Sequence, residues 1–126
     1  MLTLLCLAML AAPAAVAGET SGKDPAAVYT PKETENFKTL AKATLEALDA
    51  GQKDEMVAKL TDLETAWDDQ EDNLKPRDLA TWTLLDKTLD KAISSLRSSH
   101  VDLVKGKKAL NDLLKKLDQA TKPASS

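Results

Sequence analysis

Apolar residues recur at alternating steps of three and four along most of this chain, and this spacing is typical of amphipathic helices. The clearest stretch begins at Met56 and ends at Leu74, where the apolar positions form the seam of a heptad repeat. Three further stretches carry a similar stripe, and no segment shows the period of two that a half-buried strand requires. We expect helices over 31–50, 53–74, 76–98 and 101–120.

Boundary signals separate these four segments. Thr30 and Glu33 form a capping box around a proline, which predicts the first helix start, and Gly51 predicts its end. Pro76 divides the second segment from the third, and Ser99 opens another S-x-x-D capping pattern. Because the connections are only a few residues long, neighbouring helices should be antiparallel. The predicted fold is all-α, an antiparallel up-down-up-down four-helix bundle.

Residues at equal distances from a short turn should share a layer of such a bundle. Trp67 and Trp82 lie on opposite sides of Pro76, so we expect their rings to be neighbours in the core. The layer at this end should contain Phe37, Trp67, Trp82 and Leu117, and the layer at the other end Leu48, Met56, Ile93 and Gly106. A glycine inside a helix costs about 1 kcal/mol against alanine, so Gly106 predicts a close approach of two helices.

The N-terminal segment has the pattern of an export signal. No charged side chain occurs in residues 1–18, and an apolar run leads to Ala15-Val16-Ala17, an A-x-A cleavage pattern. We expect a Sec-type signal peptide over 1–17, a flexible leader over 18–29, the bundle over 30–120 and a disordered tail over 121–126. The protein should be bacterial and periplasmic or secreted, without stable membrane insertion after cleavage. An uncleaved membrane anchor is the alternative.

Composition limits the chemistry that is available. The net charge of −3 gives no basic excess for binding nucleic acid, and one His with one Cys cannot form a Cys/His zinc site or a disulfide scaffold. No nucleophile motif, phosphate loop or isolated carboxylate pair is present. We therefore predict no catalytic residue, no metal ligand and no cofactor.

Acidic residues gather at the end of the second predicted helix, at Asp68, Asp69, Glu71 and Asp72. Negative charge there opposes the helix dipole, and like charges four residues apart repel. The cluster is interpreted as a solvated face, as a docking patch for a basic partner or as a cation site. In the next helix Asp86 and Asp90 have lysine neighbours, which predicts a solvated flank.

The aromatic residues Phe37, Trp67 and Trp82 allow two interpretations. Large rings in helical register usually fill a core end, whereas a gap between their faces would line a ligand site. The first interpretation is the simpler one, and the second keeps these three residues as candidate ligand-lining positions.

Three sequence stretches carry a resemblance: AKLTDLETAWDDQEDNLKP, WTLLDKTLDKAISSLRSS and ALNDLLKKL. Together they resemble small secreted bacterial four-helix-bundle proteins that have no assigned reaction. The architecture also resembles the periplasmic four-helix cytochromes. In the b-type cytochromes the haem ligands are a Met early in the first helix and a His late in the last, but Phe37 and Leu117 lie near those places here. The resemblance therefore implies architecture without haem.

We expect a non-enzymatic protein-interaction or accessory module that binds another protein of the cell envelope. The alternative is a carrier of a small ligand or a cation that uses the aromatic core end or the acidic end of the second helix. The sequence does not define an oligomeric state.

Overall fold

The computed structural model describes residues 27–123, and every regular element in that range is helical. The predicted all-α class is therefore confirmed. The elements are α1 (Pro31–Asp49), α2 (Lys53–Asp69), α3 (Glu71–Leu74), the 3-10 helix η3 (Lys75–Arg77), α4 (Leu79–Arg97) and α5 (Leu103–Ala120). The predicted signal peptide, most of the predicted leader and the last three residues of the tail lie outside the described residues.

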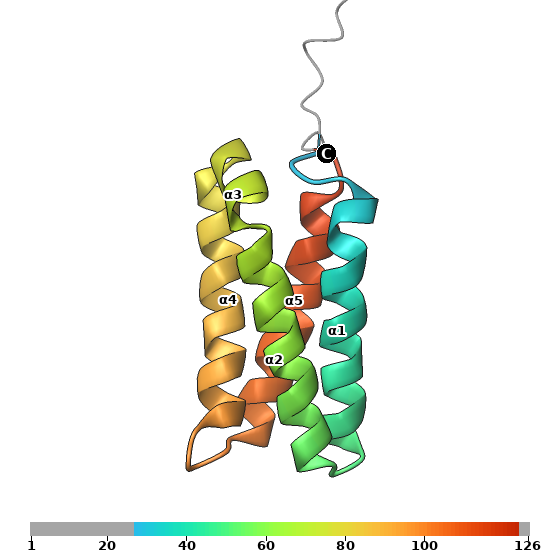
Figure 1. Ribbon diagram of the computed structural model, residues 1–126, viewed down its shortest axis with the longest axis vertical. Coiled ribbons are helices and arrows are strands. Elements are labelled where there is room, and N and C mark those ends of the chain that lie inside the picture. Colours follow the sequence, from blue (N-terminus) through green and yellow to red (C-terminus); the bar gives the residue numbers. More distant parts are fainter. Residues whose placement is uncertain (1–26, 124–126) are drawn as a thin grey trace, which may run out of the picture.

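The four long helices lie side by side along one axis (Figure 1). α1 packs against both α2 and α5, and α4 packs against α5. α2 and α4 approach each other less closely than these pairs. The α1–α2 and α4–α5 connections lie together at the lower end of Figure 1, whereas α3 lies at the upper end.

The start of α1 follows the predicted capping box. The Thr30 hydroxyl accepts a hydrogen bond from the Glu33 N–H, and the Glu33 carboxylate accepts one from the Thr30 N–H. Gly51 follows the C-terminal end of α1 with a φ of 72°, in the left-handed region that glycine adopts without strain. Both signals in the sequence are confirmed.

Three predicted helix boundaries are wrong. The segment over 53–74 is interrupted at Gln70, which separates α2 from the four residues of α3. α4 begins at Leu79 rather than at Pro76, because the Asp78 carboxylate caps it through the Thr81 N–H. α5 begins two residues later than expected. Its cap is Asp102, which accepts from the Lys105 N–H, rather than Ser99.

The three aromatic residues of the predicted layer are in contact. The rings of Trp67 and Trp82 stack with centroids 3.9 Å apart and an interplanar angle of 8°. Phe37 meets Trp67 edge-on at 5.2 Å, and Leu117 is fully buried in the same core. In the predicted layer at the other end, Met56 and Gly106 are buried, whereas Leu48 and Ile93 are only partly buried.

Gly106 lies at a close approach of α4 and α5. A Cβ atom built on Gly106 would overlap the Cγ and Cδ2 atoms of Leu96, a fully buried side chain of α4. The absence of a side chain at this position therefore lets the two helices approach, as the sequence predicted.

The packed structure begins before α1. The prediction of a flexible leader over 18–29 is wrong for its last residue, because the side chain of Tyr29 is only 1% exposed. The Tyr29 N–H donates to the Ala120 carbonyl at 3.0 Å, which fixes the chain against the end of α5. Arg77 then bridges η3 to α1 through two hydrogen bonds with the Glu33 carboxylate, at 2.7 and 2.5 Å.

Candidate functional site

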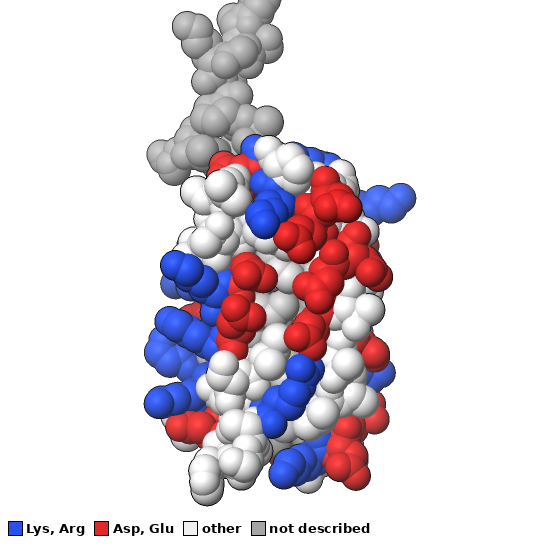
Figure 2. Space-filling view, turned by 60° about the vertical axis from the view of Figure 1, so that its left-hand side comes forward, with Lys and Arg blue, Asp and Glu red and all other residues white. Residues whose placement is uncertain are grey.

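The candidate site is a row of carboxylates that lies between α2 and α4. Figure 2 turns these two helices towards the viewer and shows acidic side chains gathered over the upper part of this face. We define the acidic seam as Glu64 and Asp68 of α2 with Asp86 and Asp90 of α4. The predicted residues Asp68, Asp69 and Glu71 lie at or beside this seam.

Mutual repulsion identifies the members of the acidic seam. Asp68 is an exposed residue, but partial desolvation raises its pKa, and the negative charges of Glu64, Glu71, Asp86 and Asp69 raise it further. Asp90 is exposed as well, and partial desolvation raises its pKa together with the charges of Asp86, Glu64 and Asp68. These carboxylates are therefore close enough to disfavour one another's ionisation.

The structure changes the composition of the predicted patch. Asp72 lies exposed in α3, outside the seam, and the charges that raise the pKa of Asp68 come from Glu64, Glu71, Asp86 and Asp69. Asp90 is exposed, as the predicted solvated flank requires, and Asp86 is partly buried; both residues also belong to the seam. The only signal for them in the sequence is their spacing of one helical turn, and that spacing does not say which helix they face.

Trp67 connects the acidic seam to the core. Its indole Nε1–H donates to Asp86 Oδ1 at 3.0 Å, so one carboxylate oxygen of the seam is held in a fixed position. The stacked rings of Trp67 and Trp82 join α2 to α4 in the core beneath the seam. The seam is thus a row of carboxylates on two helices that a buried aromatic contact holds together.

Few cations pair with the carboxylates of the acidic seam. Glu64 pairs with Arg97 at 2.9 Å at the lower end of the seam, and Glu71 pairs with Lys75 at 3.0 Å beside it. Within residues 27–123, no ion pair involves Asp68, Asp86 or Asp90. The centre of the seam therefore carries uncompensated negative charge.

The predicted ligand-lining residues form a compact cluster. Phe37, Trp67 and Trp82 are all buried, and each of the two ring contacts described above joins members of this set. The arrangement is that of rings that fill the end of a core. Phe37 also borders a surface hollow beside Asp69 and Gln70.

Two further properties concern metals and membranes. Over the range that the structure describes, no group of three or more His, Cys, Asp and Glu side chains is arranged to hold a metal ion. No helix between residues 27 and 123 has the length and apolar character needed to span a membrane.

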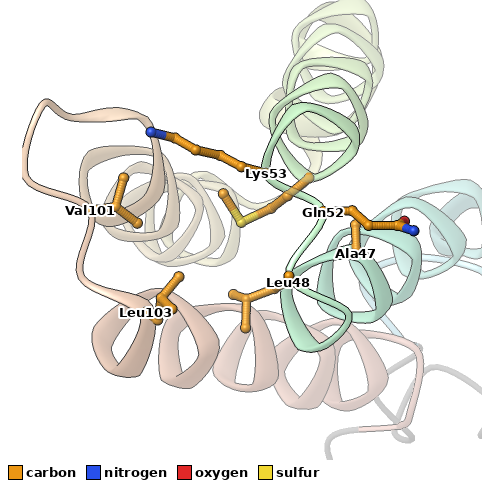
Figure 3. Close-up of a pocket in the computed structure, with 8 residues that line it drawn as sticks. Ala47, Leu48, Gln52, Lys53, Val101 and Leu103 are labelled. Atoms are coloured by element: carbon orange, nitrogen blue, oxygen red, sulfur yellow. The ribbon is translucent and has the colours of Figure 1, made fainter.

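A second hollow lies at the opposite end of the molecule, where the α1–α2 and α4–α5 connections meet (Figure 3). Its volume is about 270 Å³. The lining residues are Ala47, Leu48, Gly51, Gln52, Lys53, Met56, Val101 and Leu103. Most of this wall is apolar, and Lys53 is the one residue in it with a charged side chain. No pattern in the sequence points to this hollow, because it depends on how two loops come together.

The chain matches no protein-family model, no curated protein and no solved structure.

Proposed function

We propose that this protein is a non-enzymatic module of the bacterial cell envelope that docks a basic segment of another envelope protein on its acidic seam. The proposed architecture is the antiparallel up-down-up-down four-helix bundle. The neighbour relations of α1 with α2 and α5, and of α4 with α5, support this arrangement. The export pattern in residues 1–17 supports a periplasmic or secreted location.

One observation carries the proposal: carboxylates that repel one another are held together at the centre of the seam without a neutralising cation. Such crowding lowers the stability of the free protein, because each like-charge neighbour at helical spacing costs a few tenths of a kcal/mol. A lysine or arginine from a partner would remove this repulsion when it binds. Relief of the repulsion between the carboxylates would thus add to the binding free energy, as expected for an electrostatic docking surface.

The charge distribution of the whole chain supports a directed encounter. Residues 53–75 contain eight acidic and three basic side chains, whereas residues 100–122 contain three acidic and six basic ones. A basic partner should therefore approach the α2 side in preference to the α5 side. Because exposed charges are screened over about 8–10 Å at physiological salt, the complex should be weak and sensitive to salt.

Calorimetric titration with a lysine- and arginine-rich peptide tests this proposal. The variant Asp68→Asn/Asp90→Asn should weaken binding roughly fivefold, since exposed ion pairs contribute about 0.2–1 kcal/mol each. The matched control Asp54→Asn/Asp62→Asn removes the same charge from exposed positions of α2 outside the seam and should change binding less than twofold by the same estimate. Equal losses in the two variants would show that the peptide responds only to net charge, which contradicts docking on the seam.

The second candidate function is that of a small-ligand carrier. The observation in its favour is the apolar hollow beside Lys53, which lies away from both the aromatic cluster and the acidic seam.

A further inference from the structure

The hollow at the loop end is an apolar depression with an exposed apolar rim. Ala47, Leu48 and Met56 come from α1 and α2, Val101 comes from the α4–α5 connection, and Leu103 is the first residue of α5. Its volume of about 270 Å³ is close to the lower limit of pockets that hold small molecules. The hollow therefore has room for a medium-length aliphatic chain.

The rim exposes apolar surface that the fold does not cover. Leu103 is 52% exposed at the mouth of the hollow, and the adjacent Val104 is 80% exposed. Isolated exposed apolar residues are ordinary on protein surfaces, but Leu103 borders a concave apolar wall. An aliphatic chain in the hollow would remove part of this surface from water.

Charge at the mouth indicates the polar end of the ligand. Lys53 extends across the hollow towards the side where Val101 lies (Figure 3). Among the described residues, no ion pair uses Lys53. The neighbouring acids do not line the hollow, and one of them, Glu55, faces Lys59 at 3.8 Å. The ammonium group of Lys53 is therefore available to an anion at the mouth.

We propose that this hollow binds a medium-chain aliphatic carboxylate, with the hydrocarbon chain against Leu48, Met56 and Leu103 and the carboxylate beside the Lys53 ammonium group. This inference rests on different residues from the docking proposal and lies away from the acidic seam. Either proposal can fail without the other.

Calorimetric titration with hexanoate, octanoate and the neutral analogue octanol tests the inference. Octanoate should bind saturably at one site, with about fivefold to fifteenfold higher affinity than hexanoate, since each buried methylene contributes about 0.8 kcal/mol. Octanoate should bind about threefold to fivefold better than octanol, which is the preference expected from one exposed charge pair. Sedimentation velocity in parallel reports the oligomeric state.

Matched variants assign the two ends of the ligand. Lys53→Met should abolish the preference for octanoate over octanol. Lys32→Met, in the first turn of α1, should leave this preference unchanged. Leu103→Ser should weaken the binding of both compounds, whereas Leu79→Ser should not, although both leucines are exposed first residues of helices with aspartate caps.

Three results would overturn the inference. The first is the absence of saturable octanoate binding to a protein whose thermal unfolding is normal. The second is equal affinity for octanoate and octanol in the unsubstituted protein. The third is a dimer that dissociates in Leu103→Ser, because a second copy would then occupy the apolar rim instead of a carboxylate.

Discussion

The substitution Gly106→Ala tests the packing of α4 against α5. Alanine is favoured over glycine in a helix interior by about 1 kcal/mol, so the change alone should stabilise α5. The added methyl group, however, would overlap the Leu96 side chain, which is fully buried and cannot move into solvent. Overpacking of this kind costs about 1–3 kcal/mol. We expect a net loss of roughly 0–2 kcal/mol in the free energy of unfolding.

A double-mutant cycle isolates the contact with Leu96. Leu96→Ala alone should cost about 2–5 kcal/mol, because it leaves a cavity in the core. In that background the methyl group of Gly106→Ala enters free space, so the same substitution should stabilise the protein by about 1 kcal/mol or more. Gly106→Ala should thus be more favourable in the Leu96→Ala background than in the unsubstituted protein. If overpacking outweighs the gain in helix propensity, the substitution should destabilise the unsubstituted protein and stabilise Leu96→Ala.

Urea unfolding followed by tryptophan fluorescence measures all four proteins, since both indoles are buried and stacked. Asn111→Ala, at an exposed position of α5, is a control for helix propensity without a packing change. If Gly106→Ala stabilises both backgrounds equally, as Asn111→Ala should, then Gly106 does not mediate a close approach and the reasoning is refuted.

Other predictions concern the aromatic layer and the upper end of the molecule. Trp67→Ala should cost about 3–5 kcal/mol, and an unchanged urea midpoint would contradict its burial. The Tyr29 hydroxyl is buried without a hydrogen-bond partner among the described residues, so Tyr29→Phe should stabilise by about 1–3 kcal/mol in thermal unfolding at neutral pH. Burial raises the pKa of Tyr29 from 10.0 to about 12. The free energy of unfolding therefore has its full value below pH 10 and should fall by up to about 3 kcal/mol as the pH rises from 10 to 12, where the unfolded chain ionises first. Alkaline unfolding of Tyr29→Phe should lack this loss. The hydrogen bonds from Arg77 lower the pKa of Glu33 from 4.5 to about 2, which gives stability above pH 4.5 that is lost as the pH falls towards 2. After screening this amounts to about 1 kcal/mol, and Arg77→Gln should remove it from an acid titration of stability.

Local signals in the sequence were sufficient for the number of long helices and for much of their register. The capping box at Thr30, the glycine at Gly51 and the symmetric spacing of Trp67 and Trp82 all act over short distances along the chain. Pro76 was misleading, because a proline suits the first turn of a helix but also suits a 3-10 turn such as η3. The competing cap at Asp78 decided the boundary.

The candidate site could be predicted only in part. The local conflict of Asp68 with the helix dipole is visible in the sequence. Asp86 and Asp90 lie near Asp68 only because of how α4 is rotated about its own axis, which the sequence does not show. That rotation is fixed by the stacking of Trp82 on Trp67 and by the indole hydrogen bond to Asp86. The loop-end hollow and the burial of Tyr29 likewise depend on contacts between segments far apart in the sequence.

Docking on the acidic seam is tested most directly by NMR titration of the protein with the lysine- and arginine-rich peptide. The Trp67 indole N–H reports on the seam, because it donates to Asp86. If the peptide docks on the seam, this resonance and the backbone amides of Glu64, Asp68 and Asp90 should shift together as the peptide is added. The shifts should reverse when salt is added. Shifts spread evenly over exposed acidic residues, with the Trp67 indole resonance unchanged, would contradict docking on the acidic seam.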